Sequence, residues 1–323
     1  MSKAVRFHRT GGPEVLQVED VPAGEPGPGQ ARIRHAAIGV NFVDTYQRSG
    51  LYPTPLPAVA GNEAAGVVEA VGPGVADINA GDRVAYTGLV GAYCEKRIAP
   101  AARLVKLPDA VAEEQAASML LKGLTVHYLI FTTYPVKKGE TVLWHAAAGG
   151  VGLIACQWLK ALGVTVIGTA GSEEKTALAK AHGAEHVINY SKENFVERVK
   201  ALMGGKGVPV VYDGVGKTTW DGSLDCLQPR GLIASFGNAS GAVPPVNIGI
   251  LATKGSLYVT RPTLVTHIAS RADLVERSNA LFEVVKSGKV KVEPTKRYKL
   301  ADAQAAHRDL EERKTTGSVI LVP

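Results

Sequence analysis

The stretch from Thr141 to Cys156 constrains the fold more than any other part of the sequence. An apolar run, Thr141–Trp144, leads into a turn of small residues, and this turn opens an apolar helix expected over Val151–Leu162. Because alanine and glycine side chains are small, the backbone N–H groups of such a turn can approach a diphosphate at the positive end of the helix. The stretch therefore predicts a strand–turn–helix unit that binds a dinucleotide.

The spacing within the turn is A-x-x-G-x-x-G from Ala146 to Gly152. It is a variant of the G-x-G-x-x-G fingerprint in which Ala147 takes the place of the first glycine. Glycine-rich turns between a strand and a helix also occur for packing reasons alone, so this match by itself is weak. The segments that follow favour the nucleotide-binding interpretation.

Strands and helices alternate from Thr141 to Thr260, and glycines such as Gly163 and Gly183 stand where helices are expected to end. Further strands are predicted over Val164–Thr169, His186–Asn189, Val208–Tyr212, Leu232–Phe236 and Ser256–Thr260, and further helices over Glu173–His182, Asn194–Met203 and Thr218–Leu227. This order predicts an α/β fold with a doubly wound parallel sheet of the Rossmann type. Its ligand is expected where the strand order reverses.

The flanking segments differ in character. Residues 1–123 show short alternating strands and Gly/Pro turns, followed by a helix over Glu113–Leu121, with a second helix expected to run on from Lys122–Thr125. After Thr260, helices are predicted over 271–286 and 301–312, and a last strand over Ser318–Val322. We expect a discontinuous β-rich domain of residues 1–123 and 265–323, a nucleotide domain of residues 124–264, and ligands in a cleft between them.

Composition limits the class of protein. The 323 residues are 46% hydrophobic, which suffices for two domain cores, and no apolar run reaches the ~18 residues of a membrane span. The three cysteines, Cys94, Cys156 and Cys226, are expected to be packed thiols in a reducing compartment. The net charge of +6 is dispersed, so nucleic acid is not an expected partner. A soluble cytoplasmic protein is predicted.

The whole chain resembles the zeta-crystallin-like NADPH:quinone oxidoreductases, a zinc-independent branch of the medium-chain dehydrogenase/reductase superfamily. The strongest match begins at Gly139-Glu140, continues through Ala147–Gly152 and reaches Gln157 and Lys160. Supporting stretches are Gly39–Asp44, Gly61–Gly66, Gly81–Val84 and Gly317-Ser318. The resemblance implies a GroES-like catalytic domain beside the Rossmann domain, and a homodimer.

Departures from the zinc-dependent relatives indicate the mechanism. Asn41 stands where those enzymes place a cysteine, and Asn62, before Glu63, stands where they place a histidine. Neutral amides are poor zinc ligands, and the four-cysteine structural lobe is also missing. We therefore expect no metal. A quinone ring accepts hydride without a Lewis acid, whereas an alcohol substrate would need one to stabilise its alkoxide.

The predicted nucleotide is NADPH. An NAD enzyme of this architecture ends its second strand in an acid that binds the ribose 2′-hydroxyl, but this chain reads Thr169-Ala-Gly-Ser172 there. Ser172, Lys175 and, by the resemblance, Tyr190 would bind a 2′-phosphate. Glu173 and Glu174 oppose this weakly, since both suit the exposed first turn of a helix. Lys175 as an ordinary surface lysine is the alternative.

The leading active-site candidate is Asn41, which the resemblance places near the nicotinamide ribose and the substrate carbonyl; the alternative is a helix-capping asparagine. Asp44 would only complete the first turn of that helix. Tyr46 and Tyr52 are expected to line the quinone site, Tyr52 the more directly, and His145 is expected to be a packed residue. The cofactor-binding set is Asn41, Tyr128, Ala147, Gly149, Gly150, Val151, Gly171, Ser172, Lys175, Tyr190, Val215, Phe236, Gly237, Asn238, Val259, Arg261 and Arg313.

The predicted function is zinc-independent reduction of a quinone by NADPH. An NADPH-dependent reductase of enones or alkenals, with the same cofactor and hydride donor, is the nearest alternative. A nucleotide-responsive RNA-binding or structural protein is the alternative from another class. Turnover of a quinone and an enone side by side separates the first two, and salt-dependent RNA binding displaced by NADPH would favour the third.

Overall fold

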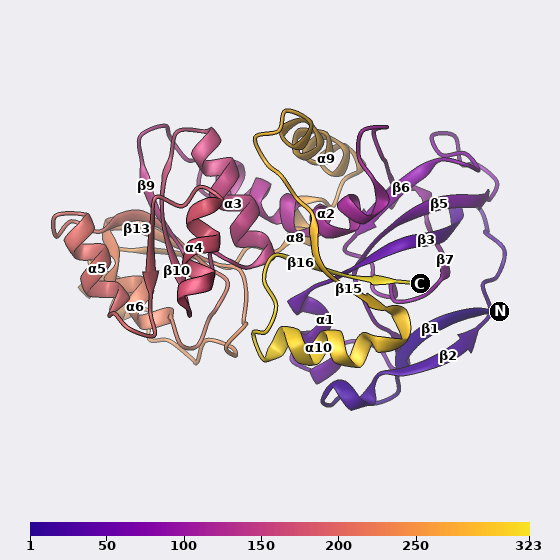
Figure 1. Ribbon diagram of the computed structural model, residues 1–323, viewed down its shortest axis with the longest axis horizontal. Coiled ribbons are helices and arrows are strands. Elements are labelled where there is room, and N and C mark those ends of the chain that lie inside the picture. Colours follow the sequence, from indigo (N-terminus) through magenta and orange to yellow (C-terminus); the bar gives the residue numbers. More distant parts are fainter. The chain divides into compact units, whose positions relative to one another are not determined.

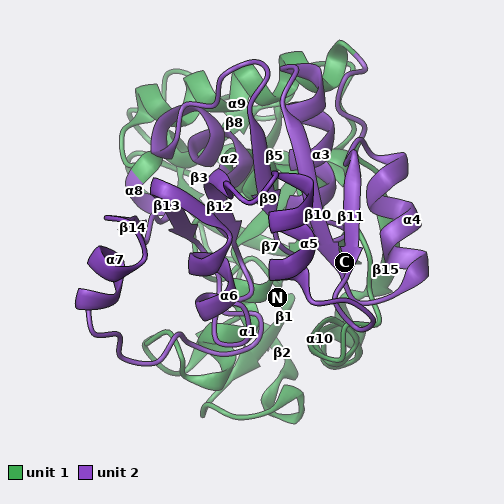
Figure 2. Ribbon diagram, turned by 90° about the vertical axis from the view of Figure 1, so that its left-hand side faces the viewer, with its two compact units in different colours: residues 1–124, 267–287, 292–323 green, residues 125–266, 288–291 purple.

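The computed structural model describes residues Met1 to Pro323. It divides into two compact units (Figures 1 and 2). Unit 1 comprises residues 1–124, 267–287 and 292–323, and unit 2 comprises residues 125–266 and 288–291. The boundaries expected from the sequence, after residues 123 and 264, stay a prediction.

Unit 2 contains a six-stranded parallel sheet in the order β11-β10-β9-β12-β13-β14. Its strands are β9 (Thr141–Trp144), β10 (Thr165–Ala170), β11 (His186–Asn189), β12 (Val208–Asp213), β13 (Leu227–Ser235) and β14 (Tyr258–Thr260). In chain order this is 3-2-1-4-5-6, so the strand order reverses between β9 and β12 and defines the switch point of a doubly wound sheet.

Helices connect these strands, and the sequence predicts all of them except the last, α7. They are α3 (Gly150–Ala161), α4 (Glu173–Ala181), α5 (Phe195–Leu202), α6 (Trp220–Asp225) and α7 (Gly249–Thr253). Helix α3 is buried along most of its length, which explains why its sequence is apolar nearly all round. The core includes one buried aliphatic residue from each of four neighbouring strands: Leu143, Ile167, Val211 and Ile233.

Unit 1 is built on two sheets. One has the order β2-β1-β4, and the other has seven strands in the order β15-β16-β3-β5-β6-β8, with β7 also paired to β3. The strands are β1 (Ser2–Phe7), β2 (Gln17–Val21), β3 (Gln30–Val40), β4 (Ala58–Val59), β5 (Glu63–Val71), β6 (Arg83–Thr87), β7 (Lys96–Pro100), β8 (Val105–Lys106), β15 (Pro294–Lys299) and β16 (Ser318–Val322). Strand β16 lies antiparallel to β3, so the C-terminal tail completes the sheet of this unit (Figure 1).

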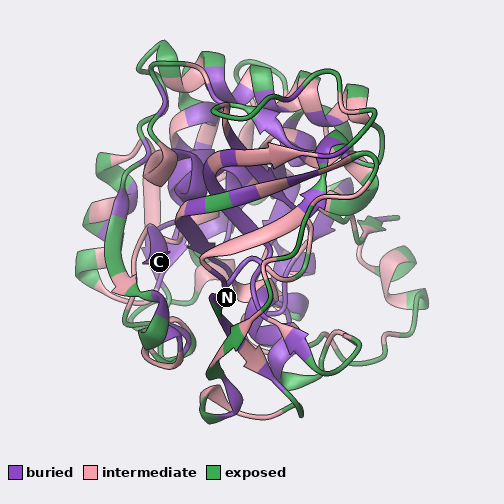
Figure 3. Cartoon of the chain, turned by 90° about the vertical axis from the view of Figure 1, so that its right-hand side faces the viewer, coloured by how far each residue is buried: buried purple, intermediate pink, exposed green.

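The helices of unit 1 flank these sheets, and buried residues gather on the strands (Figure 3). The helices of unit 1 are α1 (Phe42–Ser49), α2 (Glu113–Tyr128, which continues into unit 2), α9 (Arg271–Lys286) and α10 (Ala303–Glu311). Helix α8 (Leu264–His267) spans a unit boundary. No helix in the structure is long and apolar enough to cross a membrane.

Helix α2 differs from the expectation of two helices separated near Lys122. It is continuous over Glu113–Tyr128 and ends in a π-helical turn, Leu129–Thr133. Gly123 lies inside this helix and does not end it. A glycine suits the position because a Cβ atom there would lie 2.5 Å from the side chain of Leu281. The sequence alone does not separate a packing glycine from a helix-ending one.

Candidate functional site

The turn between β9 and α3 has the geometry of a nucleotide-binding turn. Gly149 is the N-cap of α3, with extended backbone angles (φ −79°, ψ 168°), and its N–H donates to the Ala146 carbonyl at 2.9 Å. Ala146 adopts the left-handed conformation, with φ of 53°. Ala147 and Ala148 are buried, and Gly150 and Val151 form the first turn of the helix.

Two glycines of this turn have different roles. A Cβ atom on Gly152 would lie 2.5 Å from the Ala146 carbonyl oxygen and 2.6 Å from that of Ala147, so this glycine is required by backbone packing. A Cβ atom on Gly149 would meet one atom within 4 Å, the Ala146 carbonyl oxygen at 3.2 Å. A Cβ atom at 149 would be far less crowded than one at 152, which fits a position where a diphosphate approaches the backbone.

A buried polar network lies beneath the turn. The two ring nitrogens of His145 pair with the Thr169 and Ser223 hydroxyls, each at 2.9 Å, and Ser223 Oγ donates to Asp213 Oδ2 at 2.9 Å. Burial lowers the pKa of His145. Because β9, β10 and β12 each contribute one member, the network fixes their carboxyl ends around the switch point. His145 is a packed residue, as the sequence predicts.

The carboxyl ends of β10 and β11 bring together the residues predicted to bind a 2′-phosphate. The Tyr190 hydroxyl lies against Gly171, where a Cβ atom would be 2.5 Å from it. Ser172 is the N-cap of α4, and its Oγ accepts from the Lys175 N–H at 3.2 Å, which leaves the hydroxyl hydrogen able to donate to an anion. The N-terminus of α4 adds the positive end of its dipole to this corner.

The negative charge of Glu173, beside the predicted 2′-phosphate site, is offset by a neighbouring cation. Its Oε1 accepts from Asn189 Nδ2 at 2.9 Å and pairs with Lys192 Nζ at 3.0 Å. The hydrogen bond from Asn189, followed by the one from Lys192, lowers the pKa of Glu173. Lys192 could not be predicted from the sequence, because it lies just beyond β11 and has no motif to mark it.

Four members of the predicted cofactor-binding set follow β12 and β13: Val215, Phe236, Gly237 and Asn238. The Val215 N–H donates to Asp213 Oδ1 at 2.8 Å, and a Cβ atom on Gly237 would lie 2.3 Å from the Gly214 carbonyl oxygen. Arg261 Nη1 donates to the Gly237 carbonyl oxygen at 3.0 Å, so the segment after β14 reaches back to the end of β13. Phe236 packs near Trp144, and Asn238 is nearly buried.

Val259 stands apart from this set. It lies within β14, paired in register with Ile233, and is 41% exposed. Two further members of the cofactor set, Tyr128 and Arg313, are placed in different units: Tyr128 ends α2 in unit 2 and is buried, and Arg313 follows α10 in unit 1. The roles of these three residues stay predictions.

Asn41 lies in a buried polar cluster of unit 1. It is the N-cap of α1, where it forms a capping box with Asp44, and its N–H donates to Asp44 Oδ2 at 2.8 Å. The capping role considered from the sequence is therefore present. The side chain makes a second contact that capping does not require, because Asn41 Nδ2 donates to Glu63 Oε2 at 2.8 Å.

Asp44 is more central than the sequence suggests. Its buried carboxylate accepts from Asn62 Nδ2 at 2.7 Å and from the Tyr93 hydroxyl at 2.9 Å. Burial raises the pKa of Asp44 to about 6, against the lowering effect of these hydrogen bonds. Tyr93 also pairs with His307, which lies 214 residues away in sequence. Tyr93 and His307 were missed because no local pattern links them.

The two predicted substrate tyrosines lie together. The Tyr46 and Tyr52 rings make an edge contact with centroids 5.2 Å apart, and the Tyr52 N–H donates to the Tyr46 carbonyl oxygen at 3.0 Å. Tyr46 is 8% exposed, whereas Tyr52 is half-buried. This arrangement fits the expectation that Tyr52 is the one that faces a substrate.

The positions that hold zinc in related enzymes have unsuitable donors here. Both hydrogens of the Asn62 amide are directed at oxygens, those of Asp44 and Gln47, each at 2.7 Å. Glu63 pairs with the Lys122 ammonium at 3.5 Å, and a cation bound at Glu63 would face that ammonium. No group of three or more His, Cys, Asp or Glu side chains is arranged to hold a metal ion. These residues do not fit zinc.

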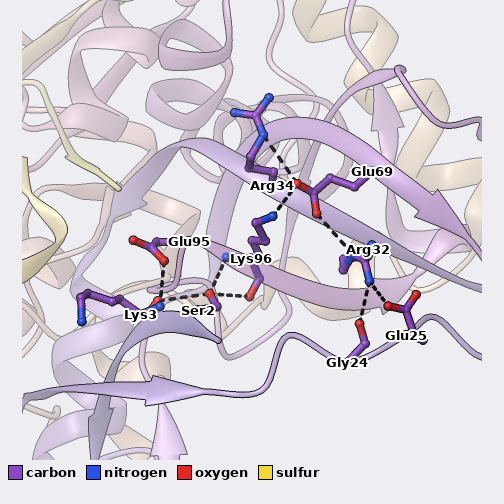
Figure 4. A network of polar contacts seen from close by, with 9 residues as sticks. All are labelled: Ser2, Lys3, Gly24, Glu25, Arg32, Arg34, Glu69, Glu95 and Lys96. Carbon is purple, nitrogen blue, oxygen red and sulfur yellow. Dashed lines mark hydrogen bonds and ion pairs between the residues drawn. The ribbon is translucent and has the colours of Figure 1, made fainter.

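Positive residues on the sheet surface of unit 1 are engaged with carboxylates (Figure 4). Glu69 pairs with Lys96 at 2.7 Å, Arg32 at 3.2 Å and Arg34 at 3.7 Å, and Arg32 also pairs with Glu25 at 2.6 Å. A cation that is paired with a carboxylate attracts nucleic-acid phosphates less strongly than an unpaired one. The cluster therefore does not favour nucleic acid as a partner.

Comparison with known proteins identifies both halves of the chain. Residues 27–109 match the family model described as the alcohol dehydrogenase GroES-like domain, and residues 150–277 match that of the zinc-binding dehydrogenases. A quinone oxidoreductase of Pseudomonas aeruginosa is 54% identical over the full length of both chains.

Two further relatives bear on the chemistry. The crystal structure of Escherichia coli quinone oxidoreductase complexed with NADPH has a TM-score of 0.98 and 54% identity, covering 99% of this chain and 100% of that one. A 2-haloacrylate reductase of a Burkholderia species is 46% identical and covers 100% of this chain and 99% of its own.

Proposed function

The chain belongs to the quinone oxidoreductase branch of the medium-chain dehydrogenase/reductase family, and from that premise we propose how its residues reduce a quinone with NADPH. It combines a GroES-like unit with a Rossmann unit. The observation that carries the cofactor assignment is the corner formed by Gly171, Ser172, Lys175 and Tyr190, which contains a cation and hydroxyl donors where an NAD enzyme has an acid.

NADPH supplies the hydride, and the residues of the chain bind and orient. The open backbone at Gly149 and the N-terminus of α3 bind the diphosphate, and the corner after β10 binds the 2′-phosphate. Asn41 orients the substrate carbonyl and Tyr52 stacks on the ring. The quinone gains the hydride and one proton from water, which gives the hydroquinone and leaves NADP⁺.

Quinones are favoured over enones because the quinone oxidoreductases are the more similar relatives. The test is NADPH oxidation with 1,4-benzoquinone and with a simple enone, both with and without a chelator. We expect rapid, chelator-resistant turnover of the quinone. Robust enone reduction without quinone turnover would contradict the proposal, and RNA binding displaced by NADPH would favour the alternative of a different class.

Replacing Lys175 by alanine is expected to weaken the preference for NADPH over NADH. One charge-assisted contact to the 2′-phosphate is lost, which costs about 1–3 kcal/mol. The ratio of kcat/KM for the two cofactors measures the effect. Lys180→Ala is the matched control, because Lys180 is exposed in the last turn of the same helix. An unchanged ratio in Lys175→Ala would rule out the 2′-phosphate role.

We also propose a cytoplasmic homodimer. Strand β14 forms a free edge of the six-stranded sheet, and apolar side chains are exposed on and around it: Ile248 (79% exposed), Tyr258 (60%), Val265 (58%) and Val259 (41%). An exposed apolar edge strand is a template for pairing with a second chain. The three free, buried cysteines are compatible with a reducing compartment.

The double variant Ile248→Lys/Tyr258→Lys is therefore expected to be monomeric. Charges on an edge strand oppose strand pairing and apolar burial. Light scattering coupled to size-exclusion chromatography gives the mass. Val18→Lys is the control, because Val18 is 43% exposed on β2 of unit 1. A double variant that stays dimeric would exclude this edge as the interface.

A further inference from the structure

Lys122 is a buried lysine without a hydrogen-bond partner. It is 5% exposed on α2, and its Nζ makes no hydrogen bond of acceptable geometry. The one carboxylate that it pairs with is that of Glu63, with Nζ 3.5 Å from Oε2. A buried ammonium is costly without a counter-charge, so the position of Lys122 requires an explanation.

Glu63 is held at fixed points and is fully buried. Its Oε1 accepts from the Leu121 N–H at 2.6 Å, and its Oε2 accepts from Asn41 Nδ2 at 2.8 Å. Gly39, which pairs with Glu63 across β3 and β5, leaves space for this carboxylate, because a Cβ atom at 39 would lie 2.3 Å from Oε2. Lys122, Glu63 and Asn41 therefore form one contiguous chain of contacts.

We propose that Lys122 is a positioning residue for quinone reduction: its ammonium is the counter-charge of Glu63, and the Glu63 carboxylate orients the Asn41 amide. The inference rests on the proposed function, in which Asn41 contacts the substrate. Lys122 acts through Glu63 and does not itself touch the quinone. In this account the chain has an internal ion pair at the place where zinc-dependent relatives hold a metal.

The charges around Glu63 support this role. Burial raises the pKa of Glu63, and the charge of Lys122 is the largest influence in the opposite direction. Asp44 on α1 and Tyr93 also face this carboxylate, and the charge of Glu63 raises the pKa of both. The charge of Lys122 is thus the largest influence that favours the ionised form of Glu63 beside these neighbours. Without it, the buried Glu63 carboxylate would have no counter-charge to hold it in this position.

The test uses Lys122→Met, which keeps an unbranched side chain one atom shorter than lysine and removes its charge. We expect kcat/KM for 1,4-benzoquinone to fall about 10- to 100-fold, the size of effect that small misplacements of a substrate-orienting group produce. The Kd for NADPH should change less than twofold. Lys106→Met is the matched control, because it removes an ion pair with Asp82 that is half exposed.

A second variant separates positioning from direct contact. In Glu63→Gln/Lys122→Met, a neutral side-chain amide replaces the Glu63 carboxylate, so no buried charge is left without a counter-charge. Its carbonyl oxygen can accept from Asn41, and its amide nitrogen takes the place of the oxygen that accepts from the Leu121 N–H in the wild-type protein. We therefore expect at least tenfold recovery over Lys122→Met. If Lys122→Met does not fold, the double variant is compared with the single variant Glu63→Gln. The double variant should then reduce 1,4-benzoquinone at least as fast as Glu63→Gln.

The outcomes distinguish this inference from the proposed function. Two results would overturn the positioning role alone. One is full activity of Lys122→Met, and the other is a folded double variant that is less active than Lys122→Met or, where Lys122→Met does not fold, less active than Glu63→Gln. Absence of quinone turnover by the wild-type protein would overturn the proposed function and this inference together.

Discussion

Replacing Gly149 by valine is expected to abolish tight NADPH binding while the protein stays folded. A valine there places a branched side chain in the path of the diphosphate, whereas within the protein its Cβ meets the Ala146 carbonyl oxygen alone, at 3.2 Å. We expect the Kd for NADPH to rise at least 100-fold, about 3 kcal/mol or more. Fluorescence titration of NADPH measures it, with urea unfolding as the check on folding.

Two other glycines complete the experiment. Gly27→Val is the matched control, because a Cβ atom there also has its nearest neighbour at 3.2 Å, the flexible side chain of Gln30. Gly152→Val should instead fail to fold, since its Cβ would lie 2.5 Å from a backbone oxygen. NADPH affinity that survives in Gly149→Val would mean that the turn packs but does not bind the diphosphate.

Acidification is expected to destabilise the protein through histidines that are buried in the neutral form. Burial lowers the pKa of His35 to about 4 and that of His307 to about 3. A histidine whose pKa is lowered on folding stabilises the folded state above its unfolded pKa of about 6.5, and the effect is lost as pH falls below it. By pH 4 each of these two histidines has lost about 3 kcal/mol of stabilisation.

Asp44 acts in the opposite direction. Its folded pKa of about 6 lies above the ordinary 3.8, so its contribution to stability increases as pH falls through 6. Asp44 therefore offsets about 2 kcal/mol, and the net contribution of these three groups is a loss of about 4 kcal/mol between pH 7 and pH 4. Urea midpoints across this range measure the loss, and His307→Gln should lower it. A protein that is more stable at pH 4 than at pH 7 would contradict the account.

The hydrogen bonds explain why these histidines are neutral. His35 Nδ1 donates to the Cys94 carbonyl oxygen at 2.7 Å, so Nε2 accepts from the Tyr86 hydroxyl at 2.9 Å. His307 Nδ1 lies 3.3 Å from Arg48 Nη1, which can only donate, so His307 Nε2 donates to Tyr93. A proton added to either ring would displace a donor that points at it.

The Rossmann unit could be predicted from the sequence because its signals are local. Each strand is a short apolar or β-branched run, and glycines near the helix ends punctuate the alternation. The corner that contains Ser172, Lys175 and Tyr190 follows the same logic, since it stands at the ends of two adjacent strands. The absence of an acid at the end of the second strand predicted NADPH, which is bound in the Escherichia coli relative.

The polar cluster of unit 1 could not be predicted in the same way. Arg48 reaches His307 across 259 residues and Glu311 across 263 residues, and no periodicity encodes such contacts. Lys122 precedes a glycine in an Ala-rich segment and has the local signature of a helix end. Its burial beside Glu63 of β5 is a tertiary effect that overrides local propensity.

Cofactor selectivity in quinone turnover is the sharpest test of NADPH-dependent quinone reduction by this protein. Initial rates of NADPH and NADH oxidation are measured with 1,4-benzoquinone and the purified wild-type protein. The account predicts turnover with kcat/KM at least tenfold higher for NADPH. Equal use of the two cofactors, a preference for NADH, or no turnover with either would contradict it.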